Sequence, residues 1–399
     1  MDYLISGLLA KMPTGLWEKI IMAFEKGFGS FALSIIVLTI IIKLLMSPVD
    51  FFNRRTNKKM ATMQKKIQSQ VDAINKKYAN DNKTKNQKLG ELYQREKINP
   101  MSSCLVMLVN LALTLTIFIT LLNGMNAMAS YKIATEFENL QTEYVAEYVQ
   151  EAYSKNIYDE ISENPDKSIY EICKPYIDEI NALGDEQKND VVSKANESVA
   201  KKYKAIKEGF LWIDNIWMAD SPMANSVPTF SNFASVAKLT KEEKADEAYK
   251  AVYEQIMNPL RESSGRANGY FILLILCAGL SFLNQYLMTK KQKKENPQMP
   301  TNKAMLVIMP IIMAVFTLFY TTMFSLYLVS SQAVSIGLTP LINLVSDKLD
   351  KKNESKQSEV IPGRMQRVVV IKDEQASEQV KQTEKQNSQG KKENKSKKK

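Results

Sequence analysis

Histidine is absent from this chain of 399 residues, and cysteine occurs only three times. Without histidine the sequence lacks the commonest general base and the commonest transition-metal ligand, which counts against an enzyme and against a metal protein. Cys104, Cys173 and Cys277 have no Cys-x-x-Cys spacing, so they predict neither a zinc site nor a disulfide framework. We therefore expect no catalytic residue, cofactor or metal. We also expect Cys173, which lies in a polar segment, to be accessible.

Charge is nearly absent from four long stretches, and a membrane helix needs about 20 mainly apolar residues. Residues 31–49 contain a single internal charge, and residues 102–122 and 269–288 contain none. The uncharged run at 304–345 is about twice the length of one span, so we expect two helices with a turn at 320–322. The predicted fold is an all-α integral membrane protein with five transmembrane helices, at 30–49, 102–122, 268–288, 304–319 and 323–345.

Basic and acidic residues are segregated between the remaining segments. Residues 50–97 hold 13 basic and 5 acidic residues, and four lysines follow at 290–294. Residues 124–266 hold 25 acidic and 16 basic residues. Cytoplasmic loops collect Lys and Arg, so the sequence predicts a basic cytoplasmic loop at 289–303 and an extracytoplasmic insertion at 123–267. The N-terminus is then outside and the C-terminus cytoplasmic.

Residues 50–99 are predicted to form a cytoplasmic helical hairpin. Apolar residues recur there at steps of three and four from Met60 to Tyr78, and a second helical pattern follows the breaker at 80–82. Methionine-rich apolar surface adapts to varied partners. Met60, Met63 and Ile67 are therefore candidates for receiving substrate helices, although a merely solvated hairpin would give the same pattern.

The two ends of the chain are predicted to lie outside the membrane core. Residues 1–29 are predicted to form an interfacial amphipathic helix with Trp17 and Phe24 as anchors, the alternative being an ordinary surface helix. Residues 346–399 are predicted to be a disordered basic tail. Such a tail binds polyanions, either ribosomal RNA or anionic lipid headgroups, unless it only increases solubility.

Polar residues form stripes on four of the predicted spans, at steps of three and four residues. Lys43 is the single charge in any span, and burying it at the bilayer centre costs about 2.5 to 3.5 kcal/mol. Such stripes can join helices, and Lys43 could extend to the nearby interface. Together they favour a hydrated groove towards the cytoplasm, lined by Thr39, Lys43, Ser47, Asn110, Thr114, Ser281, Gln285, Tyr327 and Ser331, with Asn284 beside them.

Several of these segments resemble the YidC family of membrane-protein insertases, in its five-span Gram-positive-like form. The first span resembles the family's span with its positive residue, and NPMSSCLVMLVNLALTLTIF from Asn99 resembles the entry into the second. FLWIDNIWMADSP, at 210–222, looks like the family's interfacial segment. FLNQYLM from Phe282 and the paired helices around 308–334 resemble the remaining spans. The resemblance covers about half of the chain.

The resemblance implies a five-helix bundle around a hydrophilic groove that is open to cytoplasm and lipid and closed outside. Lys43 would be the groove's positive residue, Thr39 and Gln285 its polar neighbours, and Tyr327 an aromatic residue facing the substrate. The family usually has arginine at Lys43 and prolines at Val106 and Ala112, and its loops are shorter than 131–204 and 231–261. No mechanism follows for these insertions.

The implied function is that of an insertase and assembly chaperone in the bacterial plasma membrane. Its implied partners are nascent membrane proteins, the ribosome through the basic tail and loops, and anionic lipids, with action beside the Sec channel left open. A small-solute transporter using the same cavity is the alternative, but the sequence has no internal repeat to support it. A receptor would need a cytoplasmic signalling module, and none is recognisable.

Overall fold

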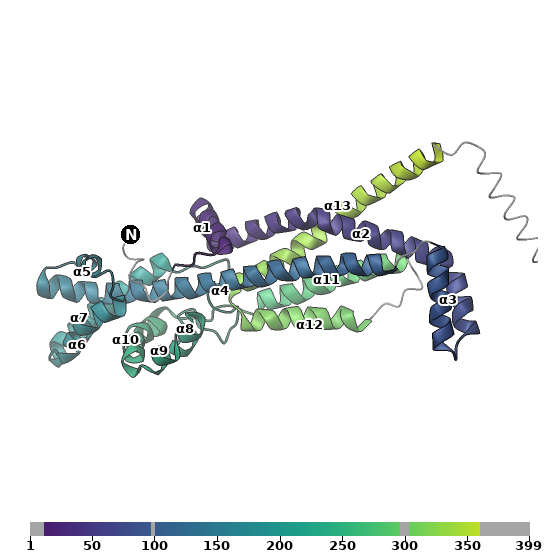
Figure 1. Cartoon of the computed structure of the whole chain (residues 1–399). Helices are drawn as coiled ribbons and strands as arrows, with labels where there is room; N and C mark the ends of the chain where they lie inside the picture. Colours follow the sequence, from purple (N-terminus) through teal and green to yellow (C-terminus); the bar gives the residue numbers. More distant parts are fainter. Residues whose placement is uncertain (1–11, 97–99, 296–302, 360–399) are drawn as a thin grey trace, which may run out of the picture. The chain divides into compact units, whose positions relative to one another are not determined.

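A computed structural model describes residues 12–96, 100–295 and 303–359 (Figure 1). The chain divides into two compact units, one ending at Thr339 and one starting at Pro340. Within the described ranges it forms helices α1 Leu16–Phe28, α2 Phe31–Lys77, α3 Asn82–Arg95, α4 Pro100–Tyr153, α5 Ile157–Glu163, α6 Ile169–Ala182, α7 Asp185–Ile206, α8 Phe230–Val236, α9 Lys241–Ala245, α10 Glu247–Ser264, α11 Ile272–Glu295, α12 Lys303–Phe319 and α13 Thr322–Glu359.

Four helical stretches are long and apolar enough to cross a membrane, judged by length and composition: Phe31–Met63, Leu108–Tyr153, Ile272–Lys291 and Thr322–Leu349. The apolar part of α12, Leu306–Phe319, is shorter. The helix break at Tyr320 and Thr321 lies within the turn predicted at 320–322. The protein is therefore an all-α integral membrane protein.

Two helices continue well beyond the apolar segments that they contain. α2 runs for 47 residues with Pro48 inside it, and α4 runs for 54 residues through Gly124 (Figure 1). The predicted segment boundaries at 49–50 and 122–123 are thus not helix ends. A helix can continue from an apolar into a polar stretch because the backbone hydrogen bonds are the same in both, and Lys, Arg, Gln and Glu favour helix about as strongly as Leu and Met.

The end of α2 and α3 pack as a helical hairpin. Ile67 and Leu92 are buried against each other, with Met60, Met63, Val71, Ile74 and Tyr93 packed around them. Asp81 caps α3, since its carboxylate accepts hydrogen bonds from the backbone N–H groups of Lys83 and Thr84. The hairpin is therefore held by a short apolar seam and by a hydrogen bond that the Arg95 guanidinium of α3 donates to Gln70 of α2 at 2.6 Å.

Residues 123–267 form what we call the insertion bundle, made of the second half of α4 together with α5–α10. Its core is rich in buried aromatic rings, among them Phe137, Tyr144, Phe233 and Tyr253. Tyr253 lies 4.7 Å from Phe137 and 4.6 Å from Phe233 between ring centroids, and its hydroxyl donates to the carbonyl of Pro228. Large aromatic side chains with satisfied polar ends give a well-defined core.

The predicted disordered tail starts too early, because α13 continues to Glu359. Residues 346–359 are helical, which is a correction to the expectation for 346–399. This stretch has no glycine or proline, and its four lysines, two glutamates, one glutamine and one leucine favour helix when they follow an established one. The predictions for residues 1–11 and 360–399, and for parts of the loops at 97–99 and 296–302, lie outside the described residues.

Candidate substrate groove and its outer closure

The polar face of α2 consists of Thr39, Lys43 and Ser47, one turn apart. Thr39 is 1% exposed, and its hydroxyl donates to the carbonyl of Ile35 at 2.6 Å. The Ser47 hydroxyl donates to the carbonyl of Leu44 at 2.7 Å. Both hydroxyls therefore bond within their own helix, while Lys43 between them is partly exposed. The lysine is the polar group on this face whose charge can act on another molecule.

Asp50 lies two turns beyond Lys43 on α2 and is the carboxylate that acts on it electrostatically. Both side chains are partly exposed. Its spacing of seven residues from Lys43 places it on the same helix face, a signal that the sequence alone contains. A carboxylate at this position reduces the positive potential of the lysine.

The predicted groove residues on α4 and α11 differ in burial. Asn110 is partly buried, and its side-chain oxygen has no hydrogen-bond partner within the described part of the chain. Thr114 is exposed. On α11, Ser281 is 6% exposed and Gln285 is partly exposed. α2 packs against both α4 and α11.

The predicted groove residues on α13 are Tyr327 and Ser331. Tyr327 is 8% exposed, and its ring lies 6.4 Å from Phe118 of α4 and 6.0 Å from Phe324 between centroids. Ser331, one turn further, is partly exposed. An aromatic cluster therefore links α13 to α4, and the accessible polar surface of α13 begins after Tyr327.

Two polar contacts between helices were missed by the sequence analysis. The Asn284 side-chain amide donates to Gln332 at 3.1 Å, joining α11 to α13. The Arg54 guanidinium donates to the Thr339 hydroxyl at 2.9 Å, joining α2 to α13. Of these four residues, the spacing of polar side chains identifies only Asn284, which lies beside the predicted groove residues of α11. Its partner lies 48 residues away in the sequence, a separation that periodicity cannot bridge.

The hairpin residues proposed to receive substrate, Met60, Met63 and Ile67, lie on the seam between α2 and α3. Ile67 is 3% exposed, and both methionines are partly exposed. Part of the methionine surface is thus occupied by Leu92 of α3, and the remainder is accessible.

The interfacial segment at 210–222 is held by two buried asparagines. Asn268 donates through its amide to the carbonyls of Asn215 at 2.8 Å and Ala219 at 3.0 Å, and its oxygen accepts the backbone N–H of Asn215 at 2.8 Å. Asn215 itself donates to the carbonyl of Ser226. This network ties the interfacial segment to the residues that precede α11.

The same segment binds the first turns of α11 and α13. Asp220, which is 4% exposed, accepts the backbone N–H groups of Tyr270 and Leu273. The backbone N–H groups of Thr322 and Met323 donate to the carbonyls of Met218 and Ile216. These contacts satisfy donors that a helix start leaves unpaired. The N-terminal ends of both helices are therefore anchored to one loop.

Trp217 and Gly269 allow close packing between the interfacial segment and the helix ends. Trp217 is 1% exposed and packs edge-on against Phe31, the first residue of α2, with 5.3 Å between ring centroids. A side chain at Gly269 would place its Cβ 1.9 Å from the Asp220 carboxylate, so only glycine fits there. The loop thus closes the ends of α2, α11 and α13 at one side of the groove candidate.

Ionised groups surround the closure. Asp214 forms ion pairs with Lys207 and Arg266, both at 2.8 Å. Burial raises the pKa of Glu208, with Lys132 opposing and Glu25 adding to the shift. Among the described residues no group of three or more His, Cys, Asp or Glu side chains is placed to hold a metal ion.

Comparison with known proteins places these features in a family. The family model described as 60Kd inner membrane protein matches residues 23–170 and 197–348. A stretch of 100 residues is 38% identical to the membrane protein insertase YidC of Fusobacterium nucleatum subsp. nucleatum, covering 25% of this chain and 47% of that protein.

Similar matches come from Rickettsia. Stretches of 98 residues are 39% identical to the membrane protein insertase YidC of Rickettsia felis and of Rickettsia prowazekii, covering 24% of this chain and 17% of each relative. The matching stretch thus spans less than half of the length of these curated relatives. The family model covers most of the chain, and the matched residues include the polar face of α2 and the interfacial segment. The chain belongs to the 60Kd inner membrane protein family, the family of the YidC proteins.

Proposed function

We propose that this protein is a membrane-protein insertase. The observation that carries the proposal is Lys43, a partly exposed cation on the polar face of an apolar helix that is anchored at one end by the interfacial segment. Names of relatives that match part of the chain, given as membrane protein insertase YidC, support it. In this reading the polar residues on α2, α4, α11 and α13 line a hydrophilic groove.

The proposed topology has five spans, with α12 as the fourth. Its apolar stretch, Leu306–Phe319, would cover about 20 Å at 1.5 Å per residue, which requires a locally thinned bilayer. The basic segments favour a cytoplasmic position for the α2–α3 hairpin and the C-terminus, and the insertion bundle then falls on the outer side in the same topology. The interfacial segment then lies at the outer end of the groove and closes it.

The proposed mechanism needs no bond-making step. A substrate helix with an acidic outer flank enters from the cytoplasm, and the flank pauses at the charge of Lys43. The hydrophobic helix then moves sideways into lipid, driven by the transfer of about 20 apolar residues out of water. A hydrated groove shortens the distance that the polar flank crosses through hydrocarbon, where a charged group costs about 2.5 to 3.5 kcal/mol.

The hairpin and the basic segments would act before insertion. The accessible part of Met60 and Met63 offers an adaptable apolar surface for an arriving helix. The lysines of the cytoplasmic segments would bind ribosomal RNA or anionic lipids through phosphate neutralisation, which weakens as salt rises. The protein would act either alone or beside the Sec channel.

Crosslinking of ribosome-bound nascent chains tests the proposal. A photoreactive amino acid at Ser331, which is partly exposed beyond Tyr327, should capture a nascent membrane helix. The same probe at Ile311, an exposed position on α12, serves as the control and should capture the helix much less. Equal capture at both positions would count against a groove, and capture at neither would count against insertase function.

Cysteine labelling tests the topology, but the native cysteines are unsuitable. Cys173 was expected to be accessible, and this expectation is wrong, because Cys173 is 0% exposed and burial raises the pKa of its thiol. In a cysteine-free variant, Asn189→Cys should react with an impermeant reagent in intact cells. Lys66→Cys, in the hairpin, should be protected. Both positions are exposed in the structure, so a reversed pattern would overturn the orientation.

A further inference from the structure

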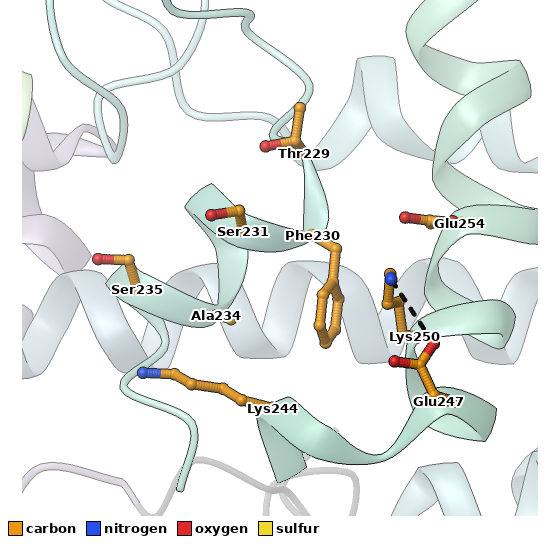
Figure 2. Close-up of a pocket in the computed structure, with 9 residues that line it drawn as sticks. All are labelled: Thr229, Phe230, Ser231, Ala234, Ser235, Lys244, Glu247, Lys250 and Glu254. Carbon is orange, nitrogen blue, oxygen red and sulfur yellow. Dashed lines mark ion pairs between the residues drawn. The ribbon is translucent and has the colours of Figure 1, made fainter. Parts of the chain in front are cut away.

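The insertion bundle carries a hollow that the insertase mechanism does not use. It has a volume of about 560 Å³ and is lined by the α8 cap Thr229 and by residues of α8, α9 and α10, namely Phe230, Ser231, Ala234, Ser235, Lys244, Glu247, Lys250 and Glu254 (Figure 2). Ligand sites in proteins commonly occupy about 300 to 1,000 Å³. The hydroxyl residues Thr229, Ser231 and Ser235 are exposed, so the hollow is open along that edge.

The floor of the hollow is rigid. Phe230 is 9% exposed, so only a small part of its ring is left for another molecule to contact. Its ring packs against Tyr253 at 5.5 Å and Tyr249 at 6.0 Å, and Tyr253 is itself fixed between Phe137 and Phe233. An apolar contact at this floor therefore requires no reordering of the protein, which lowers the entropic cost of binding.

The charges of the hollow balance but are not all paired with each other. Lys250 and Glu247 form an ion pair at 3.5 Å, drawn as a dashed line in Figure 2. Lys244 and Glu254 have no ion pair within the described part of the chain, and they lie on opposite sides of Phe230 in Figure 2. Besides the Lys250–Glu247 pair, the hollow thus presents a further cation, Lys244, on one side of the apolar floor and a further anion, Glu254, on the other. A purely anionic or purely cationic ligand would meet repulsion at one side.

We propose that this hollow binds a short peptide segment that carries an acidic and a basic side chain on either side of an apolar one. The acidic group pairs with Lys244 beside the hydroxyls of Ser231 and Ser235, the apolar side chain covers Phe230, and the basic group pairs with Glu254. The open edge lets the peptide chain continue beyond the hollow. This binding does not depend on the insertase function, since it uses the insertion bundle alone.

Peptide binding to the purified full-length protein in nanodiscs tests the proposal. The probe is a fluorescent five-residue peptide with lysine at one end, aspartate at the other and leucine between two alanines, followed by fluorescence anisotropy. Lys244→Gln should weaken its binding by about fivefold, as expected for an exposed ion pair. The same substitution should not affect a probe in which the aspartate is replaced by asparagine. Glu254→Gln should likewise weaken binding of the original probe. It should not affect a probe in which the lysine is replaced by a neutral residue.

Matched controls lie on the same helix as Lys244. Lys241→Gln and Glu242→Gln remove one charge each from exposed positions of α9 that do not line the hollow, and both should leave binding unchanged. Charge reversal sharpens the test, because Lys244→Glu should favour a probe with lysine at both ends. Absence of saturable binding, or an equal loss in the α9 control variants, would overturn the proposal.

Discussion

The helices around Lys43 and the loop that closes their ends use polar side chains in opposite ways. Around Lys43, Thr39 and Ser47 bond to carbonyls of their own helix. In the closure, Asn268 and Asp220 bond to backbone groups about 50 residues away in the sequence. The first arrangement adds no bond between helices, whereas the second ties the starts of α11 and α13 to one loop. We therefore expect the closure to be fixed and the interior around Lys43 to be adaptable.

The largest expected effect is on the closure itself. Gly269→Ala forces a Cβ to within 1.9 Å of a carboxylate that two backbone N–H groups hold in place. Overpacking of this kind costs about 3 kcal/mol, which thermal unfolding in detergent would measure. Gly279→Ala on α11 is the matched control, since nothing lies within 4 Å of its added Cβ. Equal stability of both variants would contradict a rigid closure.

A pair of asparagine variants compares the two regions directly. Asn268→Ala removes three hydrogen bonds, two of them buried, and should cost about 2 to 3 kcal/mol in the free energy of unfolding. Asn284→Ala removes one bond between membrane helices and should cost about 0.6 kcal/mol. Chemical denaturation of both variants in the same detergent measures the two losses in free energy of unfolding, which can then be compared. Similar costs would mean that the interior is as fixed as the closure.

Lys43 tests the adaptable interior through function. Lys43→Ala should impair insertion of substrates with acidic outer flanks, increasingly so as the negative charge of the flank rises. Lys43→Arg should retain insertion, because the cation remains, and Lys43→Glu should be worse than Lys43→Ala. All three can be compared by protease protection of a reporter substrate. Normal insertion by Lys43→Ala would mean that the lysine only extends to the interface, and loss of the protein itself would make it structural.

A smaller effect of opposite sign is expected at Asp50. Asp50→Asn removes the carboxylate that acts on Lys43, so the positive potential of the groove should rise. Insertion of acidic-flanked substrates should become modestly faster in the same assay. The increase should vanish in the Lys43→Ala background, and its persistence there would show that Asp50 acts elsewhere.

The smallest effect concerns pH and the closure. The folded protein raises the pKa of Glu208 above its ordinary value of 4.5, mainly through burial. The carboxylate therefore ionises less readily in the folded state, and stability should fall as pH rises from about 4.5 through the raised pKa. Glu208→Gln should flatten this fall and slightly raise the unfolding temperature at pH 7. An identical pH profile for both proteins would show that Glu208 does not contribute.

The sequence predicted features that depend on local periodicity. The steps of three and four from Met60 to Ile74 predicted the hairpin seam, and Ile67 is buried there against Leu92. The apolar runs predicted membrane helices, since length and composition determine them. The family followed from the same segments, and the family match covers them.

Features that depend on distant residues could not be predicted. Asn215 and Asn268 are 53 positions apart, and a single sequence contains no signal that pairs them. Helix continuity was also missed, because a change in polarity at residues 49 and 122 was interpreted as a boundary. A change in polarity indicates where a helix passes from an apolar to a polar environment, whereas helices end at capping residues or helix breakers. Whether the nine proposed groove residues contact substrate stays a prediction.

The uninterrupted course of α4 has a mechanical consequence. At 1.5 Å per residue its 54 residues extend about 80 Å, and no break divides its apolar half from the half in the insertion bundle. A rod of this length amplifies rotation: a tilt of about 5° around its middle moves each tip by roughly 3.5 Å. Any displacement of its apolar half would therefore also move its other end, in the insertion bundle.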